Sequence, residues 1–257
     1  MTSGKKARRQ RRTPAPPPVR STVGRQASPK VIAATTAVIG VAAVAVALAF
    51  VLTGGSSSSL TKVSKLPDAA AVLQLFRGIP QHGNVLGSPN APVTLVEYID
   101  LQCPTCRAFE TGVMPTIVPR YVRTGKVKVV ARPIAFIGSD SEVGRRAALA
   151  AAAQNRFFEF TDLLYFNQGT ENSGWLNDSM IRSAYVSIPG FNSATALREQ
   201  SSSSVTTQEA RFDNQANADQ VRGTPTVLVG KTGGQLALVS NPAVIPLSAV
   251  IDRALRQ

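Results

Sequence analysis

The sequence predicts an α/β domain that follows one transmembrane helix. Three observations support this prediction: strand-like and helix-like patterns alternate over residues 79–257, both cysteines lie where the first strong strand meets a helix, and residues 31–52 carry no charge. Strand patterns interspersed with helical ones are typical of a sheet covered by helices. The uncharged run of 22 residues, at about 1.5 Å per residue, is long enough to cross the roughly 30 Å hydrocarbon core of a bilayer.

The positive charge of the chain is concentrated in residues 1–30. This segment holds nine lysines and arginines and no acidic residue, which leaves 19 basic residues against 15 acidic ones in the rest of the chain. Its Arg, Pro and Ser content predicts a disordered tail, and it has no aromatic residue for stacking on bases. We therefore expect contact with anionic lipids rather than nucleic acid. The same charges predict a cytoplasmic N-terminus, with everything after the transmembrane helix outside the membrane.

We expect residues 31–53 to remain in the protein as the signal-anchor of a single-pass cell-membrane protein. A cleaved signal peptide is the alternative, but its charged region would be unusually long and its apolar region would exceed the usual length of about 7–15 residues. A twin-arginine export signal within residues 8–12 is disfavoured because several prolines separate it from the apolar run. Outside a bacterial membrane, disulfides form and persist.

Residues 54–78 are expected to form a flexible linker that begins with Gly and Ser and contains a short helix. The remaining residues, 79–257, form the α/β domain, in which Gly and Pro mark the ends of successive elements. The expected order is a turn at 87–92, a strand at 93–99, a helix from the cysteines to about 123 that bends near Pro115 or Pro119, a strand at 126–135, several helices over about 140–217, a hairpin of 226–230 with 235–239, and a closing helix at 246–255.

Cys103 and Cys106 are the only cysteines of the chain, and they enclose Pro104 and Thr105. A thiol at a strand-to-helix junction lies over free backbone N–H groups and the positive end of the helix dipole. This setting stabilises the thiolate, which is the form of cysteine that attacks disulfides. We expect Cys103 to be the exposed nucleophile and Cys106, one turn further, to be the buried resolving thiol. Pro104 suits the first helical turn, where a missing N–H costs little.

Glu97 interrupts an otherwise apolar strand. An unpaired carboxylate there is costly, so its pKa should be raised. Two interpretations remain open: a proton shuttle for Cys106, or a residue at the polar edge of the strand. His82 is the only histidine and is expected in a surface loop. One histidine and two cysteines do not complete a tetrahedral zinc site, so we expect no metal and no cofactor.

Three motifs, in this order, resemble DsbA-type thiol–disulfide oxidoreductases of the thioredoxin superfamily. The first is residues 87–106, which end in the cysteine pair and have proline in the first position between the cysteines, as is common in that branch. The second is Glu97, six residues before Cys103, where family members often keep a buried acid. The third is residues 223–226, Gly-Thr-Pro-Thr, at the position where the family places a cis-proline beside the active site. The resemblance covers about residues 79–257.

The resemblance implies a thioredoxin fold with a helical insertion at about 140–217. It also implies a thiol–disulfide oxidoreductase that works through a Cys103–Cys106 redox disulfide, but it does not fix the redox direction. The leading hypothesis is an oxidase that introduces disulfides into exported proteins and is reset by a membrane redox partner. No separate dimerisation module is recognisable in the sequence, which favours a monomer. Thr224 and Pro225, with the two residues between the cysteines, would contact the substrate. The best-known member has histidine at the position of Thr105, so we expect a less extreme oxidant here.

Two alternatives remain open. One is an extracytoplasmic disulfide reductase or isomerase that receives electrons from a membrane donor; Thr224 favours it, because threonine before this proline is more often associated with isomerase branches, and Pro104 opposes it. The other is a non-catalytic thioredoxin-fold binding module with a structural disulfide. A purely structural bond is disfavoured because closing so short a loop removes little entropy from the unfolded chain.

Overall fold

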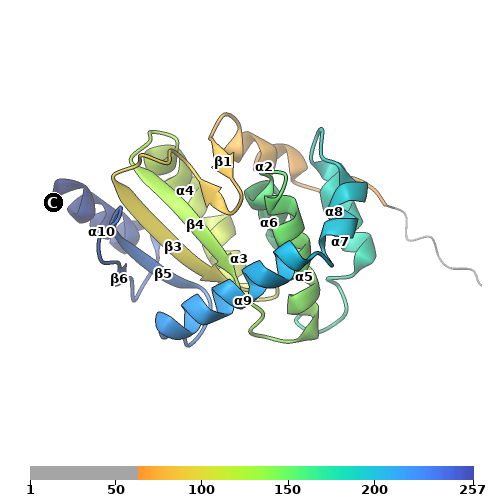
Figure 1. The fold of residues 1–257 in the computed structure, drawn as a ribbon. Coiled ribbons are helices and arrows are strands. Elements are labelled where there is room, and N and C mark those ends of the chain that lie inside the picture. The colour runs from red at the N-terminus through yellow and green to blue at the C-terminus, as the bar shows by residue number, and fades with distance from the viewer. Residues whose placement is uncertain (1–62) are drawn as a thin grey trace, which may run out of the picture. The chain divides into compact units, whose positions relative to one another are not determined.

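The computed structural model describes residues 63–257 (Figure 1). The first elements are α2 (Ala69–Phe76), β1 (Gln81–His82), β2 (Val85–Leu86), β3 (Val93–Ile99), α3 (Pro104–Gly112), α4 (Met114–Ile117), the π-helical turn η1 (Val118–Val122) and β4 (Val127–Pro133). They are followed by α5 (Ser139–Ala152), α6 (Phe157–Phe166), α7 (Asp178–Ser187), α8 (Ser193–Glu199), α9 (Ser203–Ala218), β5 (Thr226–Lys231), β6 (Ala237–Leu238) and α10 (Val244–Arg256).

Three predicted segments lie outside the described residues: the basic tail at 1–30, the anchor at 31–53 and the start of the linker at 54–62. Within residues 63–257, no helix combines the length and the hydrophobicity needed to cross a bilayer. The short helix predicted in the second half of the linker is present as α2.

The strands form one mixed sheet in the order β1-β2-β4-β3-β5-β6. β3 and β4 are parallel, and the other neighbouring strands are antiparallel. β3 is central, and all seven of its residues are buried. A strand that is covered on both faces can be apolar throughout, which explains the run that identified it in the sequence. The parallel β3–α3–β4 unit followed by the antiparallel β5–β6 hairpin and α10 is a thioredoxin-like arrangement.

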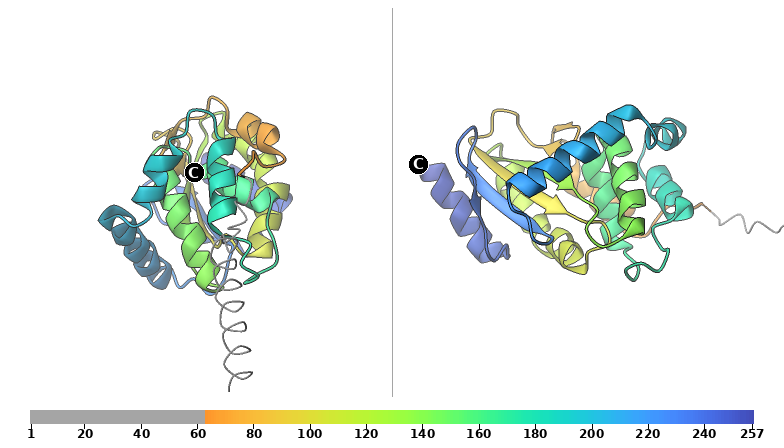
Figure 2. Two further views of the ribbon diagram at one scale, coloured as in Figure 1. Left: turned by 90° about the vertical axis from the view of Figure 1, so that its right-hand side faces the viewer. Right: turned by 60° about the horizontal axis from the view of Figure 1, so that its bottom comes forward.

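Side chains of β3 alternate between two parts of the core. Leu95 and Ile99 belong to the larger part, which includes Leu247 of α10. Tyr98 belongs to the smaller part, which includes Phe212 of α9. Figure 2 shows α9 crossing one face of the sheet, with α10 lying apart from it beyond the β5–β6 hairpin. The two faces are therefore covered by different helices.

The helical block predicted at about 140–217 is α5–α9, which gathers mostly at one end of the sheet (Figure 1). A glycine in α5 allows this block to approach the turn before the cysteines. A Cβ on Gly144 would lie 3.0 Å from Leu101 Cδ1 and 2.3 Å from Leu176 Cδ2. Close packing of this kind fixes the position of the turn relative to the helices.

Two details differ from the expected elements. The helix predicted after the cysteines is divided into α3, which ends at Gly112, and then α4 and η1, which contain Pro115 and Pro119; the backbone at Val113, between α3 and α4, remains helical. Proline lacks the N–H that would continue the helical hydrogen bonds. The second difference is the β1–β2 hairpin, which places His82 on an exposed edge strand rather than in a loop. These strands have two residues each, too short for a sequence pattern, and Asn84 secures them by donating to Ala131 O at 2.6 Å.

Candidate active site

Both cysteines lie at the start of α3, directly after the turn that follows β3. Cys103 is the N-cap residue, its carbonyl accepts from the N–H of Arg107 at 3.0 Å, and both thiols are free. Cys106 is fully buried, as predicted. The expectation of an exposed Cys103 is wrong, since only 6% of this residue is accessible. The loop that contains Thr224 covers it, because the Cys103 sulfur lies 3.2 Å from Thr224 O.

The Cys103 sulfur also lies 2.9 Å from Thr105 Oγ1. The same hydroxyl can donate to Thr224 O at 2.9 Å. A hydroxyl has a single proton, so Thr105 can turn its proton from the carbonyl to the sulfur when Cys103 ionises. Hydrogen bonding from Cys106, with help from Thr105, lowers the pKa of Cys103 from 9.0 to about 5, although partial burial opposes this change.

Burial has the opposite effect on Cys106. Desolvation raises the pKa of Cys106 well above 9.0, and the hydrogen bond to Cys103 and the neighbouring Cys103 thiolate raise it further. The two thiols therefore differ at neutral pH: Cys103 is a thiolate and Cys106 is a thiol. This division provides one nucleophile and one protonated resolving group.

Glu97, Glu110 and Asp162 form a buried acidic cluster, and each has a carboxyl oxygen without a hydrogen-bond partner. Desolvation raises the pKa of Glu97 to about 8 and those of the other two acids well above their ordinary values. Tyr165 lies near both the cluster and Cys106: burial raises the pKa of Tyr165 most, and the charges of Cys106, Glu110 and Glu97 raise it further. Glu97 is therefore predominantly neutral at pH 7, and burial favours the neutral form of the other two acids as well.

The structure excludes one of the two interpretations of Glu97, a residue at the polar edge of the strand. This residue pairs with Ala131 of β4 and Val227 of β5, so it lies in the middle of the sheet and not at a polar edge. The sequence analysis missed Glu110 and Asp162. Glu110 could have been found, because a residue four positions after Cys106 shares its face of a helix. Asp162 lies in an aromatic-rich helix, where a carboxyl group signals a buried role.

A shallow apolar groove lies beside the cysteines. The Thr224–Pro225 peptide bond is cis, as the sequence predicts. This loop and the first turns of α3 enclose a cavity of about 380 Å³. Pro104 and Thr105 are exposed at the start of α3. Side chains that line the cavity include Thr105, Phe109, Val113, Thr224, Pro225 and Pro242.

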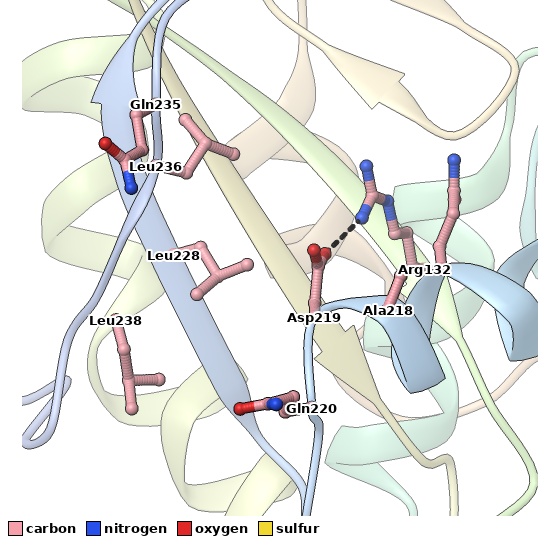
Figure 3. A pocket seen from close by; sticks show the side chains of 9 residues that line it. Arg132, Ala218, Asp219, Gln220, Leu228, Gln235, Leu236 and Leu238 are labelled. Atoms are coloured by element: carbon pink, nitrogen blue, oxygen red, sulfur yellow. Dashed lines mark hydrogen bonds and ion pairs between the residues drawn. The ribbon is translucent and has the colours of Figure 1, made fainter.

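A larger hollow of about 720 Å³ lies away from the cysteines (Figure 3). Leu228, Leu236 and Leu238 line it from the β5–β6 side, and Arg132 and Asp219 form a 2.9 Å ion pair on the opposite wall. It contains neither cysteine nor any member of the buried acidic cluster. Within residues 63–257, no group of three or more His, Cys, Asp and Glu side chains is arranged to hold a metal ion.

Comparisons with known proteins agree with this geometry. The family model described as Thioredoxin matches residues 81–235. The probable disulfide bond formation protein D of Bacillus cereus is 29% identical over 175 residues, which are 67% of this chain and 78% of that protein. Among solved structures, oxidised BdbD from Bacillus subtilis aligns with a TM-score of 0.61 at 22% identity, over 76% of this chain and 98% of that one. A thioredoxin-like oxidoreductase from Silicibacter pomeroyi aligns with a TM-score of 0.55 at 26% identity, over 74% and 98%.

Proposed function

The chain belongs to the thioredoxin family and is a protein disulfide oxidoreductase, and we propose that it introduces disulfides into exported proteins. The observation that supports this direction is the environment of Cys103, which lowers the pKa of this thiol to about 5. Stabilising the thiolate stabilises the reduced form of the pair. A reduced form that is stabilised in this way makes the disulfide a stronger oxidant.

The proposed reaction begins with the oxidised Cys103–Cys106 pair. A substrate thiolate attacks the sulfur of Cys103, a mixed disulfide forms, and Cys106 leaves as a thiolate that takes up a proton. A second substrate thiolate then attacks the substrate sulfur of the mixed disulfide, which completes the substrate disulfide and releases the Cys103 thiolate. The enzyme has gained two electrons, and a membrane redox partner removes them to restore the pair.

Two groups of residues support these steps. Glu97 is a buried acid whose raised pKa keeps it protonated at neutral pH, so it can supply the proton that Cys106 takes up. The groove beside the cysteines offers an extended substrate an apolar surface. In this proposal Pro104, Thr105, Thr224 and Pro225 contact the substrate chain.

The location proposed for this reaction is outside the cell membrane. Residues 31–53 anchor the protein as a single-pass membrane protein, and residues 1–30 remain cytoplasmic. The catalytic domain, residues 79–257, is then extracytoplasmic, where disulfides persist. It acts as a monomer, and its substrates are exported proteins with free thiols.

The reduction potential of the Cys103–Cys106 pair, measured on the full chain in detergent against glutathione, tests the direction. A value toward that of DsbA, about −120 mV, supports an oxidase, whereas one near that of thioredoxin, about −270 mV, indicates a reductase. The variant Cys106→Ser should accumulate mixed disulfides through Cys103 when mixed with unfolded proteins that contain disulfides, because the Cys103 thiolate attacks a disulfide sulfur and no Cys106 thiol is present to release the product. If no mixed disulfide forms and the pair does not equilibrate, the disulfide is structural.

A further inference from the structure

The turn that joins β3 to α3 is held by an unusual number of side-chain hydrogen bonds. The Asp100 carboxylate accepts four of them. Its Oδ1 atom accepts from Gln102 N and from Ser141 Oγ, both at 2.8 Å. Its Oδ2 atom accepts from the N–H groups of Phe136 and Ile137 at 2.7 and 2.9 Å. Asp100 therefore ties the turn to the segment that leads into α5.

The loop between α6 and α7, residues 167–177, holds the same turn from the other side. Gln168 Nε2 donates to Leu101 O at 2.9 Å and to Cys103 O at 3.2 Å. The backbone N–H of Asn172 donates to Gln102 Oε1 at 2.7 Å, and Asn172 Oδ1 accepts from Gln102 Nε2 at 3.2 Å. One loop of the helical insertion thus makes hydrogen bonds to three consecutive residues that end at the nucleophile.

The loop of residues 167–177 is itself closely packed, so its own position is well defined. A Cβ on Gly169 would lie 2.7 Å from the Trp175 side chain, and one on Gly138 would lie 2.4 Å from Asn172 Oδ1. Asn172 has a φ of 52°, in the left-handed region that asparagine tolerates better than most residues. Contacts this close leave the loop little room to shift.

We propose that Gln168 and Asn172 are positioning residues for the nucleophile. Gln168 fixes the carbonyl groups of Leu101 and Cys103, and Asn172 fixes the side chain of Gln102 between them. Together they hold the Cys103 sulfur within reach of Thr105 and the start of α3. Hydrogen bonds weaken steeply as distance and angle deviate, so a displaced turn supports the thiolate less well. The inference rests on thiol–disulfide exchange at Cys103, and it holds whether the enzyme works as an oxidase or as a reductase.

The test is the variant Gln168→Leu, which removes the donor and keeps a similar side-chain volume. Alkylation of Cys103 by iodoacetamide is measured on the reduced full chain from pH 4 to pH 8. We expect the rate at pH 5 to fall about two- to fivefold, which corresponds to a rise of the Cys103 pKa by about half a unit to one unit. The rate at pH 8, where Cys103 is ionised in both proteins, should change little.

Gln154 offers a matched control in the same insertion. Its Nε2 donates to Asn192 O at 3.0 Å, and its Oε1 accepts from Asn192 N at 2.9 Å. Gln154→Leu should lower the Tm about as much as Gln168→Leu does, because each variant removes side-chain hydrogen bonds to the backbone. Only Gln168→Leu should shift the pH profile of alkylation. An equal shift in both variants would mean general loosening and would overturn the proposal.

A milder variant covers the case in which Gln168→Leu does not fold. Asn172→Gly removes the side-chain contact with Gln102 and suits the left-handed backbone at this position. It should shift the Cys103 titration in the same direction by a smaller factor. Folded variants that titrate like the wild type would contradict the positioning role. If the wild-type protein itself lacked a low Cys103 pKa, the assignment of Cys103 as the nucleophile would be contradicted instead. Failure of the positioning role and failure of the site assignment are therefore distinguishable.

Discussion

The two cysteines of the active site are three residues apart on one helix, yet their surroundings differ in kind. Cys103 faces groups that favour its thiolate: Thr105, Cys106 and the start of α3. Cys106 is enclosed, and the buried acidic cluster lies nearby. Their pKa values consequently move in opposite directions. Motif spacing therefore identifies the pair, whereas burial and hydrogen bonding assign the roles.

The largest expected effect is the difference in reactivity between the two thiols. At pH 6, lowering the Cys103 pKa from 9.0 to about 5 increases its thiolate fraction on the order of a thousandfold over the unfolded chain. A thiolate of lower pKa is a weaker nucleophile, so the gain in alkylation rate should be about tenfold. Mass spectrometry of the native and urea-unfolded reduced protein should locate this gain at Cys103, with Cys106 unreactive. Equal labelling of both cysteines in the native protein would contradict the assignment.

The next effect concerns the buried acid Glu97 and is a change in the free energy of unfolding with pH. It is measured on the oxidised protein, so that the Cys103 thiolate makes no contribution. Folding raises the pKa of Glu97 from 4.5 to about 8, so the unfolded chain releases this proton first as pH rises. The stability that the neutral acid contributes is complete below pH 4.5 and is lost as pH rises through about 8. This loss amounts to a few kcal/mol, at about 1.4 kcal/mol per pH unit.

Glu97→Gln keeps the shape of the side chain and removes its titration. The free energy of unfolding, measured by urea titration between pH 5 and pH 8, should therefore decrease less steeply with pH than in the wild type. Some slope should remain because Glu110 and Asp162 also have raised pKa values. The exposed Glu171 is the control, and Glu171→Gln should leave the slope unchanged. A wild-type slope in Glu97→Gln would show that Glu97 is not the buried titrating group.

The smallest effect concerns one hydrogen bond on the nucleophile side. Thr105→Val removes the hydroxyl that lies 2.9 Å from the Cys103 sulfur and preserves the shape of the side chain. A hydrogen bond to a charged group contributes about 1.5–3 kcal/mol, so the pKa of Cys103 should rise by about one to two units. The thiolate absorbance at 240 nm, followed against pH, measures this rise.

Thr111 is the matched control on the same helix, because its hydroxyl donates to Arg107 O at 2.8 Å on the exposed side. Thr111→Val should leave the Cys103 titration where it is in the wild type. If both threonine variants shift the titration equally, the effect comes from the helix as a whole and not from the Thr105 hydroxyl.

Much of the fold could be predicted from local patterns. The central strand was identifiable because both of its faces are covered, so its residues are almost all apolar. The helical block, the hairpin and the closing helix were identifiable from their periodicity and from Gly and Pro at their ends. The β1–β2 hairpin was not, because its pairing with β4 depends on residues more than 40 positions away.

The candidate site shows the same division. Cys103, Cys106 and Pro225 were identifiable because their spacing and order in the chain are distinctive. The role of Asp162 and the hydrogen bonds of Gln168 were not, since both residues come from the helical insertion, some 60 positions after the cysteines. The spacing of residues along the chain does not show which distant side chains the fold places next to a given thiol.

The sequence by itself determined the α/β class, the redox-active pair and the order of the elements around it, because these depend on hydrophobic periodicity and on neighbouring residues. Only the tertiary structure decided that Cys103 is covered by the Thr224 loop, that Glu97 lies in mid-sheet beside unpaired acids, and that the helical insertion holds the catalytic turn. The physical reason is that solvation and hydrogen bonding, which set the pKa of each group, depend on packing between segments that are distant in the chain.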